Sequence, residues 1–290
     1  MMDKQNNNSS NNNIIQVRNL VTHYGSKKIL NGVDLAVEKG EVMVIMGGSG
    51  SGKSTLLRYM LGLNKPTSGS IELLGKDITK MSNNQLHQMK KKIGVSFQGG
   101  ALFGSLTVSE NIQLPLREHA KLDVNTMRIM SQMKLEVVNL AGFEDLMPSQ
   151  LSGGMIKRAA LARAIILDPP LLFFDEPSAG LDPVVSAELD ELILRLKDVM
   201  GMTIVVVTHE LDSAFKIADK ITILDRGDIL LCGTVDEVKN SDNERVYNLL
   251  HRKPRRDTVD VDEYLQRLTG RSLNLESEKI NSDFVVTKSV

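Results

Sequence analysis

"GGSGSGKST", Gly47 to Thr55, is the stretch that decides the fold. The pattern G-x-x-x-x-G-K-[ST] is satisfied by Gly47, Gly52, Lys53 and Ser54. Glycines let backbone N–H groups approach phosphate oxygens, and a helix that starts directly after the loop adds partial positive charge. An apolar strand-like segment, "VMVIMG", leads into the loop, and an amphipathic helix-like segment follows it. In this context we predict a nucleotide-binding loop and not a chance glycine-rich turn.

The residues of this loop have separate expected tasks. Lys53 is expected to reach the β- and γ-phosphates of ATP and to assist catalysis, and the Ser54 hydroxyl is expected to bind Mg²⁺. The expected nucleotide contacts of the loop come from Gly47, Gly48, Ser49, Gly50, Ser51, Gly52, Lys53, Ser54 and Thr55. ATP and Mg²⁺ are therefore the predicted ligands.

Outward from the loop, strand-like and helix-like segments alternate. "IIQVRNLVTHYG" and "GVDLAVEKGEVMVIMG", which precede the loop, are rich in Val and Ile with glycine punctuation. Leu56, Leu57, Met60 and Leu61 share one face of the helix that follows the loop. Next, "GSIELLG" and "KKIGVSFQ" are predicted strands on either side of a polar helical stretch around residues 81–92.

Residues from about 107 to 168 are predicted to be mostly helical, with Asn111, Pro115 and Pro148 as breaks. Beyond them come the strand "LLFFDEP", the helix "SAELDELILRLKDVMG", the strand "TIVVVTHE", the helix "LDSAFKIADK" and the strands "ITILD" and "GDILLCG". Alternating strands and helices on both sides of a helical insert predict an α/β fold. We expect a parallel sheet with a helical subdomain at about residues 101–165.

Polar residues stand where three of these strands end. Ligands of α/β proteins collect at the carboxyl ends of parallel strands. Asp175, in "LLFFDE", is therefore expected to hold Mg²⁺ directly or through water, and Glu176 to polarise the attacking water. His209 ends "VVVTH" and is a candidate γ-phosphate contact. Gln98 ends "IGVSFQ" and offers its amide to Mg²⁺ or to the catalytic water.

The composition narrows the class of protein. The 290 residues include 35 Lys and Arg against 36 Asp and Glu, a formal net charge of −1, so no general attraction to nucleic acid is expected. The apolar runs have the length of buried strands and the N-terminus has no apolar signal region, which predicts a cytoplasmic protein whose membrane role needs a partner. The single cysteine, Cys232, is expected to be a small buried side chain in a reducing compartment.

Both ends of the chain differ in composition from its middle. Residues 1–13 are rich in Asn and Ser and are predicted to form a disordered tail. Residues 251–290 are polar with blocks of charge, and are predicted to be a C-terminal extension outside a domain of residues 14–250. The basic run at 252–256 could contact anionic lipid headgroups, or could be a solvated cluster balanced by the acids beside it.

Together these motifs resemble the nucleotide-binding subunits of ABC transporters. In order along the chain, the resemblance is carried by "GGSGSGKST", Gln98, "LSGGM" at 151–155, "LLFFDE", "SAGLD" at 178–182 and His209. It implies a P-loop NTPase core of the RecA-like type, with an antiparallel β subdomain and a helical subdomain that carries the "LSGG" signature. It also implies hydrolysis of ATP to ADP and phosphate.

In this family two subunits form a head-to-tail dimer, and each "LSGG" faces the γ-phosphate held by the other subunit. The resemblance therefore assigns Ser152, Gly153 and Gly154 to the other subunit's ATP site. There a hydroxyl, backbone N–H groups and a helix N-terminus would stabilise phosphate charge. The resemblance also implies that Tyr24 stacks on adenine and that Asp182 of "SAGLD" belongs to the nucleotide site. Met155 stands where the commoner signature, "LSGGQ", has glutamine.

Three further features are similar to one branch of the family, which serves the Mla phospholipid-transport system and related MCE-associated transporters. They are "GALF" after Gln98, "PLREH" at 115–119 and the methionine of "LSGGM". The similarity implies a homodimer on the cytoplasmic side of a bacterial inner membrane, bound peripherally to an integral-membrane permease like MlaE. A small STAS-domain protein like MlaB and, through the permease, a periplasmic MCE-domain ring like MlaD would complete the complex.

In this branch, ATP hydrolysis would move phospholipids between the inner and outer membranes and so maintain outer-membrane lipid asymmetry. A C-terminal extension in this branch contacts the opposite ATPase subunit and the STAS partner, which gives residues 251–290 a hypothetical role. The permease would bind the substrate, so no residue of this chain names it, and ATP hydrolysis at the motor looks alike for import and export.

Three alternatives stay open. The chain could serve another ABC transporter, for an amino acid or a metal complex. It could be a soluble ABC ATPase of DNA repair, translation or cluster assembly, although it has one nucleotide-binding loop and no long heptad arms. It could also be a scaffold that binds ATP without hydrolysing it, against which Lys53, Asp175, Glu176 and His209 all argue.

Overall fold

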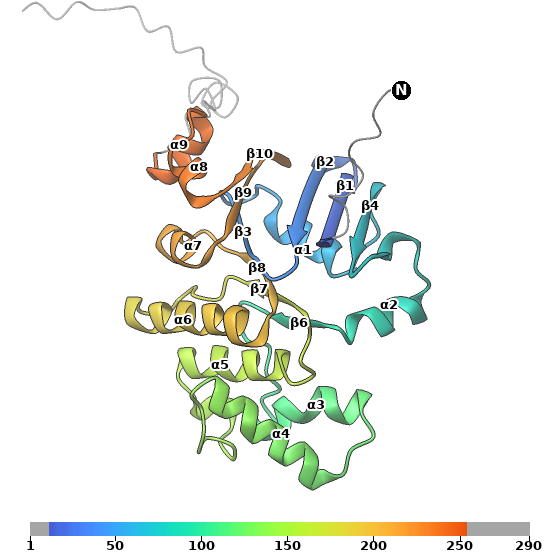
Figure 1. Ribbon diagram of the computed structural model, residues 1–290, viewed down its shortest axis with the longest axis vertical. Coiled ribbons are helices and arrows are strands. Elements are labelled where there is room, and N and C mark those ends of the chain that lie inside the picture. The colour runs from blue at the N-terminus through green and yellow to red at the C-terminus, as the bar shows by residue number, and fades with distance from the viewer. Residues whose placement is uncertain (1–11, 254–290) are drawn as a thin grey trace, which may run out of the picture. The chain divides into compact units, whose positions relative to one another are not determined.

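The computed structural model describes residues 12–253. The chain divides after Arg252 into two units, and the first is built from two sheets and the helices around them (Figure 1). The predicted boundaries at residues 13 and 250 stay predictions, and the C-terminal extension lies almost entirely outside the described residues. Asn13, at the predicted end of the tail, is the first residue of a strand.

An antiparallel sheet of four strands has the order β2-β1-β4-β5. Its strands are β1 (Asn13–Tyr24), β2 (Lys27–Glu38), β4 (Ser68–Leu73) and β5 (Lys76–Asp77). A second sheet of six strands has the order β10-β9-β3-β8-β7-β6. Its strands are β3 (Val42–Met46), β6 (Ile93–Ser96), β7 (Leu171–Asp175), β8 (Thr203–Val207), β9 (Lys220–Asp225) and β10 (Asp228–Gly233). From β9 to β6 all neighbours are parallel, and β10 adds an antiparallel edge.

Every residue of the central strands β3 and β8 is buried because both faces of the sheet are covered. Along β3 and β8, Val44 and Val206 belong to one buried cluster, together with residues of the helices. Their neighbours Ile45 and Val205 belong to the other cluster, which includes residues of the antiparallel sheet. The predicted α/β fold with a parallel sheet is therefore confirmed, and the antiparallel sheet closes one of its faces.

The helices follow the predicted order. They are α1 (Lys53–Met60), α2 (Asn83–Lys90), α3 (Val108–His119), α4 (Val124–Val137), α5 (Gly153–Ala164), α6 (Pro183–Met200), α7 (Leu211–Ile217), α8 (Val235–Lys239) and α9 (Glu244–Leu250), with short 3₁₀ turns η1 (Ile78–Lys80) and η2 (Pro148–Gln150). The four apolar residues expected on one face of α1 are all buried. Among residues 12–253, no helix combines the length and the apolarity that crossing a bilayer requires.

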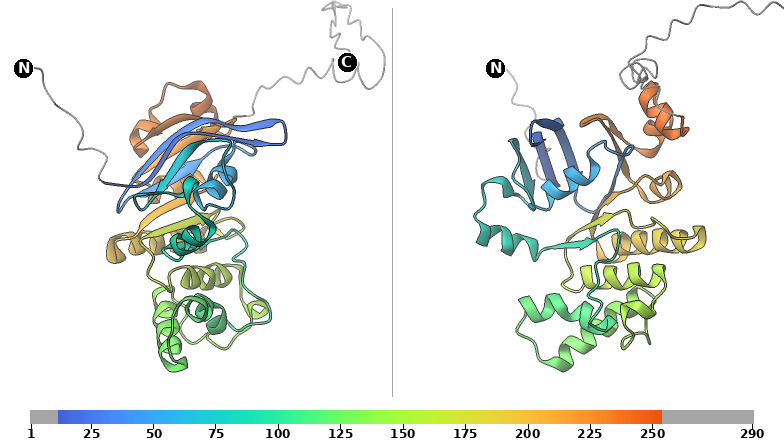
Figure 2. Two further views of the ribbon diagram at one scale, coloured as in Figure 1. Left: turned by 90° about the vertical axis from the view of Figure 1, so that its right-hand side faces the viewer. Right: turned by 180° about the vertical axis from the view of Figure 1, so that it is seen from behind.

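The helical insert consists of α3, α4 and α5, which pack on one another, and α5 also packs on β6. Figures 1 and 2 show α5 between the parallel sheet and the pair α3 and α4. The prediction that Asn111 and Pro115 break the helical stretch is wrong, because both lie inside α3. The apolar residues at i, i+4 and i+8 of this helix, Val108, Ile112 and Leu116, are buried, so tertiary packing overrides the local effect of the proline.

The expectation for Cys232 is also wrong, because its side chain is exposed. It lies on β10, which ends the order of the sheet and, among the strands of residues 12–253, pairs with β9 alone. Thr222 on β9 donates a hydrogen bond to Cys232 Sγ at 3.3 Å. An edge strand has no neighbour on its outer side to cover it, which the apolar sequence "DILLCG" does not indicate.

Candidate nucleotide site

The glycine-rich loop leaves β3 at Gly47 and enters α1 at Lys53. A Cβ atom on Gly47 would lie 2.0 Å from the carbonyl oxygen of Leu224 and 2.7 Å from Ser51 Oγ, so the backbone of β9 leaves room only for glycine. Gly227 N donates to the Ser51 carbonyl at 2.9 Å. The turn after β9 therefore holds the glycine-rich loop through a main-chain hydrogen bond.

Polar groups of the loop are arranged as an anion site requires. The Lys53 ammonium donates to the carbonyl oxygens of Gly47 at 2.7 Å and Gly48 at 3.2 Å, which holds it over the loop. Gly52 is left-handed, with φ 110°, at the N-terminus of α1, a conformation that favours glycine. The Ser51 hydroxyl is buried and has no hydrogen-bond partner among residues 12–253. An ammonium, a helix N-terminus and an unsatisfied hydroxyl fit the phosphates of a nucleotide.

The carboxyl ends of β7 and β8 bring the predicted catalytic groups together. Because Asp175 pairs with Val207, Glu176 lies beside the segment that carries His209. His209 Nδ1 is 2.9 Å from Glu176 Oε2, and the Thr208 hydroxyl donates to the same oxygen at 3.2 Å. Two groups that are 33 positions apart in sequence, 176 and 209, thus form one pair.

Asp175 lies in an environment that fits a cation. Burial and the adjacent charge of Glu176 raise the pKa of its carboxyl group, and Arg58 and Lys53 act in the opposite direction. A divalent cation at this position would favour the ionised carboxylate and offset the burial. The buried carboxyl group of Asp175, with its raised pKa, therefore agrees with the predicted Mg²⁺ site.

Gln98 and Tyr24 emerge at exposed positions. Gln98 follows β6, which is parallel to β7 with Ser96 opposite Phe174, so it leaves the sheet at the same edge as Asp175. Tyr24 ends β1 on the antiparallel sheet, and its side chain is 47% exposed. A ring exposed in this way is available for stacking, but its contact with adenine stays a prediction.

The signature residues form a second cluster with the start of α6. Ser152 caps α5, and its hydroxyl accepts a hydrogen bond from Met155 N at 3.3 Å. A Cβ atom on Gly154 would lie 2.7 Å from Val185 Cγ1, so α5 and α6 approach closely there. Asp182 caps α6 and accepts hydrogen bonds from the N–H groups of residues 184 and 185 at 3.0 and 3.1 Å. The carboxylate of Asp182 therefore caps its own helix. The prediction that Asp182 belongs to the nucleotide site did not include this role.

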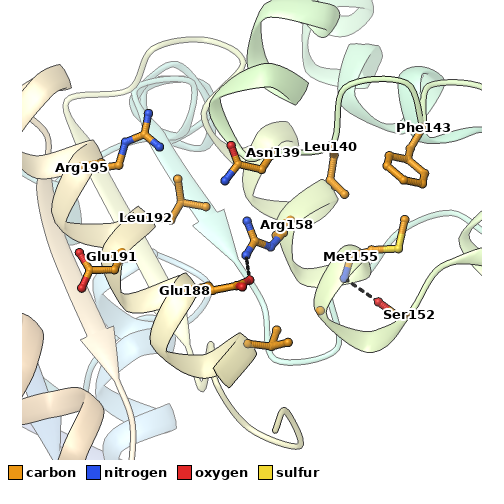
Figure 3. Close-up of a pocket in the computed structure, with 12 residues that line it drawn as sticks. Asn139, Leu140, Phe143, Ser152, Met155, Arg158, Glu188, Glu191, Leu192 and Arg195 are labelled. Atoms are coloured by element: carbon orange, nitrogen blue, oxygen red, sulfur yellow. Dashed lines mark hydrogen bonds and ion pairs between the residues drawn. The ribbon is translucent and has the colours of Figure 1, made fainter. Parts of the chain in front are cut away.

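A cavity of about 580 Å³ lies between α5, α6 and the segment after α4 (Figure 3). Its lining residues are Asn139, Leu140, Phe143, Ser152, Gly154, Met155, Arg158, Val185, Glu188, Glu191, Leu192 and Arg195. Arg158 donates to Glu188 Oε2 at 2.6 Å and to the Val138 carbonyl at 3.1 Å. Met155 therefore lines a cavity of its own chain, which none of the glycine-loop residues lines.

Sequence reasoning missed three basic residues of α5, namely Lys157, Arg158 and Arg163. The Lys157 ammonium donates to the Glu176 carbonyl at 3.0 Å. Arg163 donates to the carbonyl oxygens of Gly100 and Ala101, each at 2.8 Å. The signal was available in "IKRAALARAI", where basic residues interrupt a run of small apolar ones in a helix expected to be packed.

A family model described as "ABC transporter" matches residues 30–179, which include the glycine loop, the signature, Asp175 at the end of β7 and Glu176 directly after it. The chain belongs to the ABC transporter family. As an ABC ATPase it binds and hydrolyses ATP. The tasks of its individual residues stay predictions.

Curated relatives of this ABC ATPase cover most of its length. A protein from Haemophilus influenzae, "Intermembrane phospholipid transport system ATP-binding protein MlaF", is 42% identical over 83% of this chain and 91% of its own. The protein of the same name from Escherichia coli K12 is 40% identical over 82% of this chain and 88% of its own. A Mycobacterium leprae protein, "Probable ribonucleotide transport ATP-binding protein mkl", is also 40% identical, with 68% of its own length covered.

Solved structures support the same ABC ATPase fold. The ATP-binding cassette MJ0796, in a dimeric post-hydrolysis state bound to ADP and Pi, has a TM-score of 0.71 and 31% identity, covering 76% of this chain and 98% of that one. The structure of cbiO1 from Clostridium perfringens, part of the transporter complex cbiONQ, has a TM-score of 0.74 and 27% identity, covering 88% and 95%. The predicted P-loop core with an antiparallel β subdomain and a helical subdomain is confirmed.

Proposed function

We propose that this ABC ATPase powers phospholipid transport between the inner and outer membranes, and so supports outer-membrane lipid asymmetry. The observation that carries the proposal is the likeness to two MlaF proteins across more than four-fifths of the chain. The mycobacterial relatives named for ribonucleotide transport are nearly as similar, but the chain covers only about two-thirds of their length. Phospholipid transport is therefore the better-supported function.

The site residues divide the reaction among themselves. Lys53 and the N–H groups of its loop bind and orient the phosphates of ATP, and Tyr24 stacks on the adenine. Ser54, Gln98 and Asp175 would hold Mg²⁺, whose charge would neutralise the phosphate oxygens. The Glu176 carboxylate orients a water molecule and accepts its proton, while His209, held at 2.9 Å from Glu176, donates a hydrogen bond to the γ-phosphate.

The signature cluster acts in a second copy of the chain, in a homodimer. Ser152, Gly153 and Gly154 present a hydroxyl and backbone N–H groups at the start of α5, where a helix N-terminus favours an anion. The neighbour MJ0796 has been solved as a dimer, which supports the same arrangement here. Each ATP is then bound between the loop of one subunit and the signature of the other.

Mixing two inactive variants tests this arrangement. Lys53→Ala removes the phosphate ligand, and Gly153→Asp puts a repelling carboxylate into the signature, where a Cβ atom meets only Leu181 Cδ2 at 3.8 Å. Each variant alone is expected to lose phosphate release. In an equal mixture, half of the dimers contain one subunit of each variant. Each such dimer has one intact site, formed by the loop of the Gly153→Asp subunit and the signature of the Lys53→Ala subunit. The mixture is therefore expected to recover roughly a quarter of wild-type activity. A mixture as inactive as its components would refute the shared site.

Affinity purification of the tagged full-length chain from detergent-solubilised membranes tests the transport function. We expect a permease, a STAS-domain protein and an MCE-domain protein to co-purify, and the untagged chain to recover none of them. The complex reconstituted with labelled phospholipid should move lipid only with ATP. Recovery of a different permease would instead assign the motor to another substrate.

A further inference from the structure

We propose that α5, the helix behind the signature, positions the two catalytic segments of its own subunit through Lys157 and Arg163. Lys157 would act on Glu176, and Arg163 on the turn that contains Gln98. Both are positioning residues, because neither is placed to touch the nucleotide. The inference rests on the proposed function of the site and adds a physical connection between its two halves.

Lys157 holds the main chain at the proposed general base. Glu176 has φ 50°, a left-handed conformation that residues other than glycine rarely adopt. Its N–H donates to the Val207 carbonyl at 2.8 Å, and its carbonyl accepts from the Lys157 ammonium at 3.0 Å. The carbonyl also accepts from Ala179 N at 3.3 Å, so β8 fixes the N–H of Glu176, and α5 together with the turn after Glu176 fixes its carbonyl. Burial lowers the pKa of Lys157 and the charge of Glu176 opposes this, as expected for an ammonium drawn into the structure.

Arg163 holds the turn at Gln98. Gly100 N donates to the Phe97 carbonyl at 2.8 Å and closes the turn around Gln98. The guanidinium of Arg163 donates to the carbonyls of Gly100, the last residue of this turn, and Ala101, which follows it, each at 2.8 Å. Two parallel contacts from one planar group fix direction as well as distance.

The fit of this turn against α5 is close. Gly100 has φ 73°, and a Cβ atom there would lie 2.7 Å from Ile156 Cγ2 on α5. Ala101 is also left-handed, with φ 50°. The backbone that follows Gln98 is therefore shaped to lie on α5.

These contacts connect the two halves of the site. α5 begins directly after Ser152, the residue proposed to face the other subunit's ATP, and runs without interruption to Ala164. A shift of this helix when its signature meets a nucleotide would displace Glu176 and Gln98 together, because packed helices move as rigid bodies. Arg158, which lies between the two positioning residues, points instead to Glu188 (Figure 3).

Steady-state kinetics of the full-length protein test the proposal. In Lys157→Met and Arg163→Gln we expect kcat to fall roughly tenfold or more, as it does when a supporting contact of a site is lost, with KM for ATP changed less than about twofold because the glycine loop is untouched. The matched controls Lys121→Met and Arg128→Gln, both exposed, should keep the wild-type kcat. Arg163→Lys should recover part of the loss, because one carbonyl contact can re-form.

Two further measurements separate positioning from stability. Hydrogen exchange should accelerate at the amides of residues 97–103 in Arg163→Gln and at those of residues 176–179 in Lys157→Met. In a Gln98→Ala background, Arg163→Gln should lower kcat no further. Wild-type kcat per folded molecule, or a full additional loss in that background, would overturn the proposal.

Failure of the positioning role of α5 can be distinguished from failure of the proposed function. If Gln98→Ala and Glu176→Gln keep the wild-type rate, the proposed catalytic roles fail, while hydrogen exchange still reports whether α5 holds the two segments. Should Arg163→Gln not fold, Gly100→Ala tests the contact from the other side, because its Cβ would press on Ile156. It should lower kcat without raising KM, and a normal kcat would contradict the inference.

Discussion

Glu176→Gln is expected to lower kcat for ATP hydrolysis by roughly 10²–10⁴-fold, the usual effect of losing a positioned base, and to leave ATP binding intact. Glutamine keeps the shape of the side chain, so the contact with the Thr208 hydroxyl at 3.2 Å can be retained. It cannot accept a proton from water at neutral pH. Phosphate release gives the rate, and equilibrium binding of labelled ATP gives the affinity.

The control for this variant is Glu118→Gln, which removes an exposed carboxylate at the end of α3. We expect its rate and affinity to match the wild type. Hydrolysis at the wild-type rate by Glu176→Gln would show that another group activates the water. A parallel loss of ATP affinity would instead mean that the left-handed segment at Glu176 supports the nucleotide loop.

Gly47→Ala is expected to weaken nucleotide binding. The new Cβ would lie 2.0 Å from the Leu224 carbonyl oxygen, and that oxygen belongs to the backbone of β9 and cannot turn away. The loop must withdraw, so its N–H groups and Lys53 leave their positions. We expect ATP affinity to fall by roughly tenfold or more, the loss of at least one charged hydrogen bond. The free energy of unfolding should fall by about 1–3 kcal/mol through overpacking.

Gly104→Ala is the matched control, because a Cβ atom there has nothing within 4 Å and the residue lies outside the glycine loop. Its thermal unfolding and ATP titration should follow the wild type. If Gly47→Ala bound ATP normally, β9 would have to be able to move away from the loop, which the ladder between β9 and β3 argues against.

Much of the site could be predicted because chemistry in this fold is placed at the ends of strands. Asp175, His209 and Gln98 were each recognised from an apolar run that ends in a polar residue, and parallel pairing brings such ends to one edge. The register of β7 and β8 then decides that Glu176 meets His209 Nδ1 at 2.9 Å. The spacing of the two residues in the sequence does not predict this contact.

Other features depended on packing that a linear pattern does not record. Pro115 lies within α3 because the buried face of that helix offsets the missing hydrogen bond. Cys232 is exposed because β10 is an edge strand. Asp182 is a different case, because its cap of α6 is a local contact over two and three positions that the pair Asp182–Pro183 already signals in the sequence.

The sequence by itself determined the loop, its helix and the succession of strands along the chain, because these depend on local geometry: glycine where the backbone must turn, and apolar residues where both faces are covered. Only the tertiary structure decided what Lys157 and Arg163 do. Their partners are carbonyl oxygens 19 positions away for Lys157, and 62 and 63 positions away for Arg163. A carbonyl is present at every residue, so nothing in the sequence distinguishes the ones that fold against α5.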